Sequence, residues 1–276
     1  MRIIPRAFKY SRDIISVYLT ERKYFMRPIS FKDIYYRGQI VFENDLFLHK
    51  HTAEMLLLYD GNFLQFKRMP SLTELQDAVA YLRDYHVKKG QDHVKLLFPE
   101  NETIPESIVD YLKTSGYDIG FMELYAIQPN QFPVIPPVSN IMVKKVTEVT
   151  LSELYELRFE MDAEISERFA SQKKYLHEQN FTDERFLQII AYYDNKPVGT
   201  VDVIVGEDMA EIDGLIVLDS YQKKGIGGQI QKFVMEEFHD KTVILIADGE
   251  DTPKEMYKKQ NYEFQGIKYE ALKVFK

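Results

Sequence analysis

The residues best suited to chemistry in this chain form one short, basic, glycine-rich stretch. It reads Gln222-Lys223-Lys224-Gly225-Ile226-Gly227-Gly228. Glycines let backbone N–H groups turn toward an anion with no Cβ in the way, and a helix that begins there adds partial positive charge. The stretch is therefore predicted to cradle phosphate oxygens.

The elements around this loop must place it between a strand and a helix. Before it, residues 210–218 alternate acidic and apolar side chains and then become apolar, which predicts a strand. After it, apolar residues recur at helical spacing at Ile226, Ile230, Phe233, Val234 and Phe238. An isolated Gly-x-Gly in such a place is also compatible with turn geometry alone.

Two common phosphate-binding motifs do not fit the stretch. A Walker loop has its lysine after the glycines and a hydroxyl residue next, whereas both lysines here precede Gly225. The dinucleotide fingerprint requires a third glycine where Ile230 stands, and its acidic ribose partner falls in an expected turn at Asp240.

The order Gln, two residues, Gly, one residue, Gly resembles the acetyl-CoA pyrophosphate loop of the GNAT (GCN5-related N-acetyltransferase) family. The resemblance extends to the strand before the loop, where Glu211, Val217 and Tyr221 match the family pattern. It continues after the loop in a strand, a tyrosine and a final strand, matched by 243–247, Tyr257 and 261–264.

The resemblance implies a mixed, twisted α/β (α+β) sheet flanked by helices, and direct acyl transfer from acetyl-CoA to an amine. Backbone amides of the strand would orient the pantetheine, and the loop would hold the pyrophosphate, chiefly through its main chain. The implied coenzyme-binding residues are Leu215, Ile216, Val217, Gln222, Lys223, Lys224, Gly225, Ile226, Gly227 and Gly228. A solvated basic pair is the alternative for the two lysines.

Three side chains are the candidate catalytic groups. Glu211 stands where a branch of the family carries its general base, and Asp213 shares its strand face. Neighbouring carboxylates could raise one pKa by mutual repulsion, although an ordinary exposed strand face is equally compatible. Tyr257 stands where the family protonates or hydrogen-bonds the coenzyme sulfur; burial in the core is the alternative.

The chain departs from the family pattern at two positions. Glu250 replaces an asparagine that commonly touches the coenzyme, and Asn261 replaces a glycine. Acidic residues flank the implied acceptor site and could attract a cationic amine, although charge runs on helices are commonly solvated faces. They are Glu153, Glu156, Glu160, Asp162, Glu164, Glu167, Asp248, Glu250 and Asp251.

Composition excludes several other classes. The 276 residues contain no cysteine, so disulfides, thiolate metal sites and cysteine nucleophiles are ruled out. The net charge of -8 lies beyond residue 135, and no basic stripe predicts nucleic-acid binding. Without a long apolar run, we expect a soluble, cytoplasmic protein with no membrane contact.

Histidine offers weak metal candidates. His49 and His51 would lie on one face of a strand, but the sequence shows no third ligand, so no metal is expected. His177 is expected to be a solvated helix residue rather than part of a pocket.

Four prolines between Gln128 and Asn140 predict a linker. We therefore divide the chain into residues 1–128, a linker at 129–140 and a catalytic domain at 141–276. The first part repeats the late order of elements, with a hairpin at 56–67, a helix at 71–88 capped by Ser71, and a strand at 93–98. It has Arg68 to Thr73 in place of the loop, so a second, degenerate GNAT-like domain in tandem is expected; an unrelated α/β domain is the alternative.

The expected function is acetyl-CoA-dependent N-acetylation of a primary amine on a small molecule or peptide, with a homodimer as a candidate assembly. The alternative is a non-catalytic acyl-CoA-binding module that acts through a protein partner. An aminoacyl-tRNA-dependent transferase is a more remote alternative, which the missing basic patch disfavours.

Overall fold

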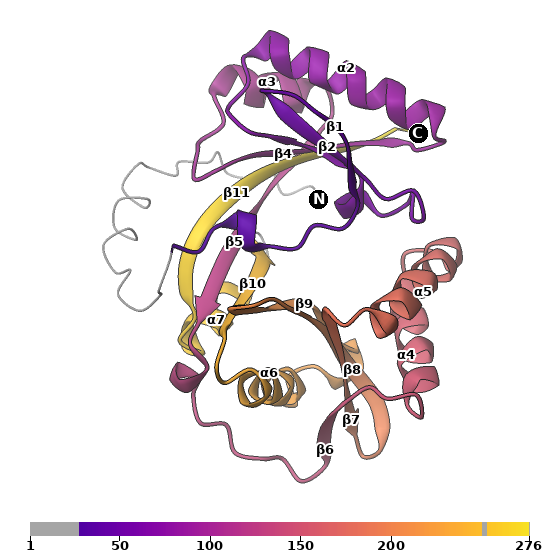
Figure 1. The fold of residues 1–276 in the computed structure, drawn as a ribbon, viewed down its shortest axis with the longest axis vertical. Coiled ribbons are helices and arrows are strands. Elements are labelled where there is room, and N and C mark those ends of the chain that lie inside the picture. Colours follow the sequence, from indigo (N-terminus) through magenta and orange to yellow (C-terminus); the bar gives the residue numbers. More distant parts are fainter. Residues whose placement is uncertain (1–27, 250–252, 276) are drawn as a thin grey trace, which may run out of the picture.

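The structure, a computed structural model, describes residues 28–249 and 253–275. One mixed sheet of eleven strands runs through this described part, in the order β1-β2-β3-β4-β11-β5-β10-β9-β8-β7-β6 (Figure 1). The strands are β1 (Gln39–Glu43), β2 (Phe47–His51), β3 (Phe63–Phe66), β4 (His93–Glu100), β5 (Asp118–Ile127), β6 (Ile141–Lys145), β7 (Phe186–Tyr193), β8 (Lys196–Val205), β9 (Met209–Val217), β10 (Thr242–Asp248) and β11 (Glu263–Val274).

Helices cover this sheet in both halves of the chain. The α-helices are α2 (Leu72–Lys88), α3 (Glu106–Thr114), α4 (Leu151–Ala163), α5 (Glu167–Thr182), α6 (Ile226–Glu237) and α7 (Pro253–Lys259). Short 3-10 helices lie at Phe31–Asp33, Tyr59–Gly61, Pro129–Gln131 and Asp219–Tyr221. None of the described helices has the length and apolar character needed to cross a bilayer.

The two halves exchange their last strands at the centre of the sheet. β11, from the end of the chain, lies between β4 and β5 and is antiparallel to both. β5, which precedes the proline-rich segment, lies between β11 and β10. The chain divides at 129–140 in sequence, but backbone hydrogen bonds join the two halves across that division.

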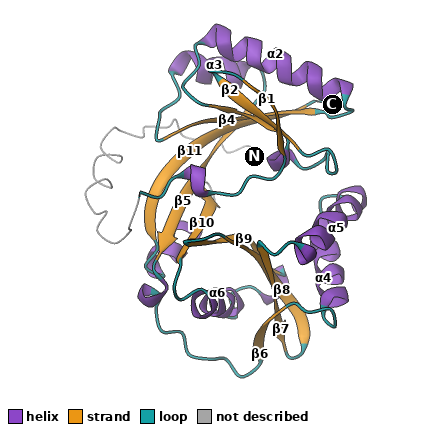
Figure 2. Ribbon diagram, viewed as in Figure 1, coloured by secondary structure: helices purple, strands orange, loops and turns teal. Residues whose placement is uncertain are grey.

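Alternate residues of the C-terminal strands bury opposite faces of the sheet. α6 packs on one face through Ile230 and Val234, against Val201 and Val203 of β8. α4 packs on the other face through Leu154 and Leu157, against Ile190 and Tyr192 of β7, and α5 lies beside it (Figure 2). The period-2 and period-3.6 patterns of the sequence explain this layering.

The N-terminal half has its own helical cover. α2 begins at a capping box, because the Ser71 side chain accepts from the Glu74 amide while the Glu74 carboxylate accepts from the Ser71 amide. Leu75 and Leu82 of α2 and Ile108 of α3 share one core cluster with residues of β3 and β4. The predicted helix at 71–88 and strand at 93–98 are therefore confirmed.

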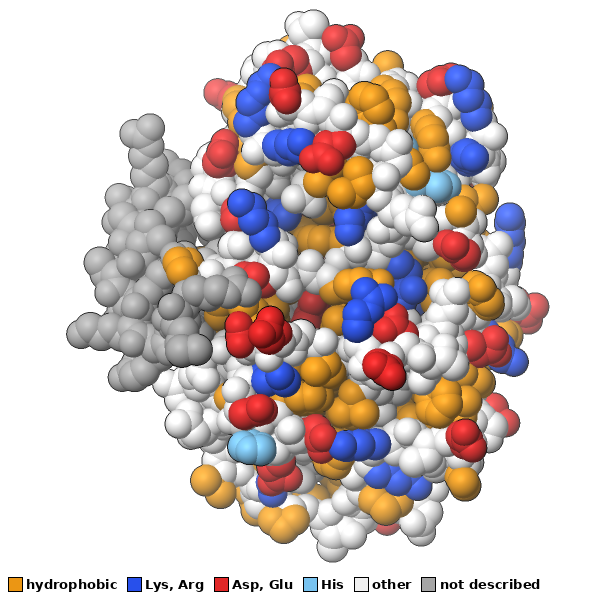
Figure 3. Space-filling view, in the orientation of Figure 1, with side chains coloured by type: hydrophobic (Ala, Val, Ile, Leu, Met, Phe, Trp, Pro, Cys, Tyr) orange, Lys and Arg blue, Asp and Glu red, His pale blue; other side chains and the backbone are white. Residues whose placement is uncertain are grey.

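An extended N-terminal segment crosses the central strands on the face opposite α6. Ile29, Phe31 and Ile34 pack against Leu124 of β5 and Ile244 of β10. Figure 3 shows the outer surface in the orientation of Figure 1, with basic and acidic side chains interspersed over its described part.

The predicted hairpin at 56–67 is wrong in its first strand. Residues 56–61 form turns and a 3-10 helix, and β3 pairs with β2 instead. The buried Asn62 side chain explains the difference: its amide donates to the carbonyls of Met55 and Leu58, and its oxygen accepts from the Thr52 amide. These bonds satisfy the turn backbone, which a strand would otherwise pair with a neighbour.

Candidate functional site

A β-bulge interrupts β9 where the resemblance places the pantetheine-binding amides. Thr200 pairs with Ile216 and Asp202 pairs with Asp213, so β9 has one more residue than β8 in this interval. Gly214, inside the bulge, has a φ of +61°. This bulge lies next to Leu215 and turns the local backbone out of the regular ladder.

β9 and β10 separate where the bulge begins. Their parallel pairing runs from Thr242 and Met209 to Leu245 and Ile212, although β10 continues to Asp248. Residues 213–217 thus lie past the end of the shared ladder. The divergence places the bulge, rather than a continuous sheet, beside the glycine-rich loop.

Glu211 lies just before the bulge and is buried, with 5% of its surface exposed. The backbone N–H of Tyr35 donates a 2.8 Å hydrogen bond to its Oε2 atom. Burial raises the pKa of Glu211 to about 8, helped by the charge of Asp213 and opposed by the Tyr35 amide. A carboxyl with such a pKa is suited to accept a proton near neutral pH.

Asp213 stands two residues further along β9 and is exposed. Its side chain reaches solvent, but the protein atoms packed around it reduce its solvation, and this, together with the nearby charge of Asp202, raises its pKa to about 6. The structure thus brings the two predicted carboxylates onto adjacent positions with different environments, one buried and one open.

A buried ion network supports this strand from the α4 and α5 side. Arg158 donates to both carboxylate oxygens of Asp202 and, at 3.1 Å, to the Thr200 hydroxyl. Asn180 donates to Asp202 at 2.8 Å. Burial alone would raise the pKa of Asp202, but Arg158 holds it below its ordinary value. The network holds β8 in place beside β9, where Asp202 pairs with Asp213.

His177 belongs to the same network, so its prediction as a solvated residue is wrong. Its Nδ1 accepts from Arg158 at 2.8 Å and its Nε2 lies 3.1 Å from Asp162. Asp162 also binds Lys173 and is buried, which removes it from the expected open acidic field. Arg158 went unnoticed in the sequence, although the four-residue spacing of Arg158 and Asp162 places them on one helix face.

The glycine-rich loop leads directly into α6. Lys223 and Gly225 have φ values of +61° and +87°, and Gly225 is the N-cap, without a side-chain cap. The first helical hydrogen bond runs from the Gln229 amide to the Gly225 carbonyl. The amides of residues 226–228 therefore have no intrahelical acceptor, which is the donor arrangement that binds phosphate.

The two lysines of the loop lie in different settings. The Lys224 ammonium lies 4.6 Å from the Tyr221 ring centroid and 4.9 Å from that of Tyr193. Gln222 donates to Asp219 at 2.7 Å. These contacts order the loop, while the side chain of Lys223 is exposed beside it.

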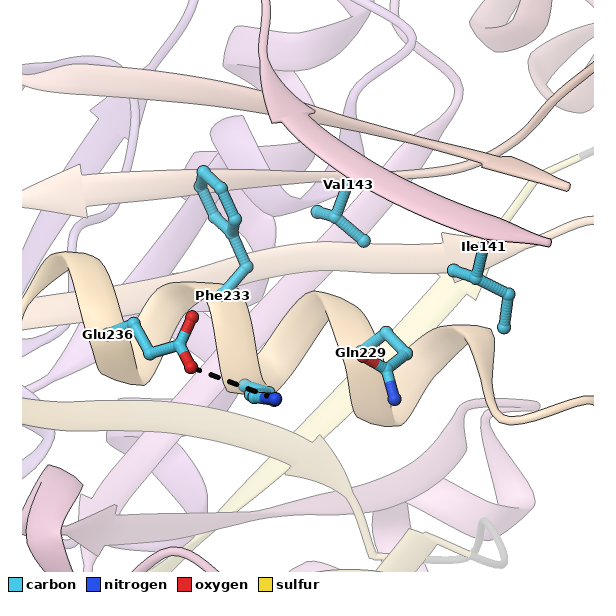
Figure 4. Close-up of a pocket in the computed structure, with 6 residues that line it drawn as sticks. Ile141, Val143, Gln229, Phe233 and Glu236 are labelled. Carbon is cyan, nitrogen blue, oxygen red and sulfur yellow. Dashed lines mark ion pairs between the residues drawn. The ribbon is translucent and has the colours of Figure 1, made fainter. Parts of the chain in front are cut away.

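The proline-rich segment lies along α6 behind this loop. Gln229 donates to the Pro136 carbonyl at 2.7 Å and Lys232 to the Ile135 carbonyl at 3.1 Å. Figure 4 shows the adjoining small pocket, in which Ile141 and Val143 of β6 face the helix. Gln229, the Lys232–Glu236 ion pair and apolar side chains line it, and none of the three candidate catalytic residues does.

Tyr257 lies on α7 within an aromatic cluster built by both halves. Its ring centroid is 5.4 Å from that of Tyr125 on β5 and 5.4 Å from that of Tyr262. Tyr125 in turn donates to Glu123 at 2.6 Å. The strand exchange therefore supplies a neighbour of Tyr257 that no motif in the sequence indicated.

Asn261 has a φ of +66°, the conformation expected of a glycine replacement, whereas Glu250 and Asp251 lie outside the described residues.

A cavity of about 540 Å³ lies between the halves, next to the segment that holds Glu211. Tyr35, Arg37 and Lys50 line it from the N-terminal side, and Gln179 and Arg185 from the C-terminal side. Arg37 also donates to Asn180, which links the cavity wall to the Asp202 network.

Two family models match the chain, one on each side of the proline-rich segment. Residues 150–262 match the model of the acetyltransferase (GNAT) family. The C-terminal half is a GNAT domain. Residues 29–125 match a model described as a domain of unknown function. A search of curated proteins gives no match.

Solved structures resemble both halves together. A functionally unknown conserved protein from Staphylococcus epidermidis is 29% identical, with a TM-score of 0.82, over 90% of this chain and 98% of the other. A GCN5-related N-acetyltransferase from Kribbella flavida is 15% identical, with a TM-score of 0.56, over 85% and 89%. A tandem GNAT protein from the clavulanic acid pathway is 10% identical, with a TM-score of 0.50, over 77% and 75%. The predicted mixed sheet flanked by helices, with two GNAT-type units in tandem, is confirmed.

Proposed function

We propose that this protein is an acetyl-CoA-dependent N-acetyltransferase acting on a primary amine of a small molecule or peptide. The observation that carries the proposal is Glu211, a buried carboxyl with a raised pKa, directly before a β-bulge at the point where β9 and β10 separate. The GNAT fold supports acyl transfer in general, and this placement supplies a proton acceptor for it.

The described residues fit a coenzyme A pyrophosphate. The loop offers three amides at the start of α6, two backbone positions with positive φ, and no side chain that caps the helix. We assign Gln222–Gly228 to the pyrophosphate and Leu215–Val217 to the pantetheine. When bound, acetyl-CoA supplies a thioester carbonyl and a thiolate leaving group.

We assign the acid–base roles by environment. Asp213, being exposed, receives the ammonium of the acceptor, and Glu211 takes its proton, directly or through water. Tyr257 donates a proton toward the coenzyme sulfur, and Tyr125 and Tyr262 position its ring. Tyr35, whose amide binds Glu211, also lines the cavity between the halves.

The proposed reaction is tested by measuring free-thiol release from acetyl-CoA across a panel of amines. Glu211→Gln should lower kcat about 100-fold or more on the best amine and flatten the rise of rate with pH near pH 8. Glu207→Gln, on an exposed turn, is the matched control and should behave as wild type.

Tight coenzyme A binding with no turnover on any amine would contradict the enzyme and favour the acyl-CoA-binding module. We further propose that the protein is cytoplasmic and binds neither nucleic acid nor a membrane. Its partner besides acetyl-CoA is the amine acceptor, and a homodimer is a candidate assembly. The interspersed charges on the face in Figure 3 support a small acceptor over a polyanion.

A further inference from the structure

Three buried histidines meet in the N-terminal half, away from the glycine-rich loop. His49 and His51 lie on the same face of β2, and His86 comes from the last turn of α2. One ring nitrogen of each lies within 4.8 Å of the others. The fold thus supplies the third ligand that the sequence did not reveal.

Each of these rings has a buried nitrogen with no hydrogen-bond partner among the described residues: His49 Nε2, His51 Nδ1 and His86 Nε2. Unpaired buried polar atoms are uncommon in folded proteins, and three in one cluster call for an explanation. His86 Nδ1 lies 2.7 Å from the His93 carbonyl, which can only accept, so His86 Nε2 carries a lone pair.

We propose that His49, His51 and His86 bind a divalent cation of the zinc class. Three neutral imidazoles are a common donor set for Zn²⁺, with bonds of about 2.0–2.1 Å. A tetrahedral ion needs ligand nitrogens about 3.4 Å apart, so each ring would move inward by less than about 1 Å on binding.

The surroundings of the rings resemble the outer shell of a metal site. His49 Nδ1 lies 3.1 Å from the Tyr81 hydroxyl, and His86 Nδ1 is held by the His93 carbonyl. The Tyr85 ring stands edge-on to both His49 and His51. Such partners fix ring orientation and leave the opposite nitrogen for a metal.

His51 lines the cavity between the halves, which gives an ion a route to the buried rings. Three protein ligands leave the fourth position of a tetrahedral ion for a water molecule. The proposal is independent of the acetyltransferase, since none of these residues belongs to its assigned machinery.

The test uses the full chain without an affinity tag, stripped of metal by a chelator. Titration with Zn²⁺ against a competing chromophoric chelator should show about one equivalent bound with submicromolar affinity. Co²⁺ should give the visible absorption of a four-coordinate nitrogen site. His51→Gln should weaken Zn²⁺ binding about 100-fold, whereas His239→Gln, on an exposed turn, should match wild type.

Equal Zn²⁺ affinity in wild type and His51→Gln would overturn the site, as would the absence of stoichiometric binding in wild type. A second measurement avoids dependence on a variant that misfolds. Excess Zn²⁺ should raise the Tm of the stripped wild-type protein by about 5 °C, reversed by EDTA. An unchanged Tm would contradict the proposal.

Discussion

The backbone N–H of Tyr35 donates a 2.8 Å hydrogen bond to the carboxylate of Glu211, 176 positions away in the chain. The bond brings the N-terminal half into contact with the proposed base. Because only 5% of the Glu211 surface is exposed, this bond supplies a hydrogen-bond donor in place of water. The N-terminal half is therefore part of the environment that sets the protonation of this site.

The raised pKa of Glu211 makes stability depend on pH in a defined direction. Its pKa rises from 4.5 to about 8 on folding, so between these values the folded state holds a proton that the unfolded state has lost. Stability should therefore fall as the pH rises through this window. Glu211→Gln should remove this fall. The difference in free energy of unfolding between Glu211→Gln and wild type should therefore shift by about 3 kcal/mol in favour of the variant from about pH 5 to about pH 8.

Chemical denaturation at both pH values measures this difference, with Glu207→Gln as the control for loss of one surface charge. A Glu211→Gln effect of the same size at both pH values would show that Glu211 does not titrate in this window.

Gly225→Ala should weaken coenzyme A binding more than it weakens the fold. Both Gly225 and Gly116 have positive φ, at +87° and +78°, and an added Cβ meets no other atom within 4 Å at either position. Each alanine should cost about 1 kcal/mol of stability through backbone strain. Only Gly225→Ala should raise the Kd for coenzyme A, by about 10-fold or more, as measured by calorimetry. Equal Kd values for the two variants would remove the loop from the binding site.

Tyr257→Phe tests the proton donor while keeping the aromatic cluster. The phenyl ring retains the contacts with Tyr125 and Tyr262, so the Tm should change little. kcat should fall about 10- to 100-fold, with little change in the KM for acetyl-CoA. Tyr175→Phe, at an exposed position on α5, controls for loss of a phenol. An unchanged kcat would assign Tyr257 a packing role.

Arg158→Met should be among the more destabilising single changes in the GNAT domain. It leaves the Asp202 carboxylate buried beside His177 without its bidentate cation, at a cost of about 3–5 kcal/mol. The double variant Arg158→Met/Asp202→Leu should recover part of this loss, since it removes the unpaired charge. Urea denaturation of the four proteins in the cycle measures the coupling. Additive losses would show that the two residues are not coupled.

The strand exchange predicts that the halves do not fold independently. Residues 141–276 alone would leave β10 without β5 and β11 without either neighbour, exposing unpaired edges at the centre of the sheet. We expect each half to be aggregated or unfolded alone, and co-expressed halves to associate, as tested by co-purification and circular dichroism. Two cooperatively folded, non-associating halves would contradict this expectation.

Local patterns in the sequence determined much of the GNAT domain. The Gln222–Gly228 loop, the strand before it and the helix after it follow from glycine placement and hydrophobic period, and both are short-range properties. In the N-terminal half, the helix that begins after Ser71 was equally predictable from its N-cap residue. In contrast, Leu56 to Tyr59 looked like a strand because apolar residues gather there, whereas the buried Asn62 side chain holds a turn.

Only the tertiary structure decided which distant residues share a site. The amide of Tyr35 reaches Glu211, Tyr125 from one half packs on Tyr257 of the other, and His86 joins His49 and His51. Such contacts depend on strand order and register, which emerge from the packing of the whole sheet rather than from any one segment. The exchange of β5 and β11 is of this kind, because a strand's own residues specify its alternation but not its neighbours.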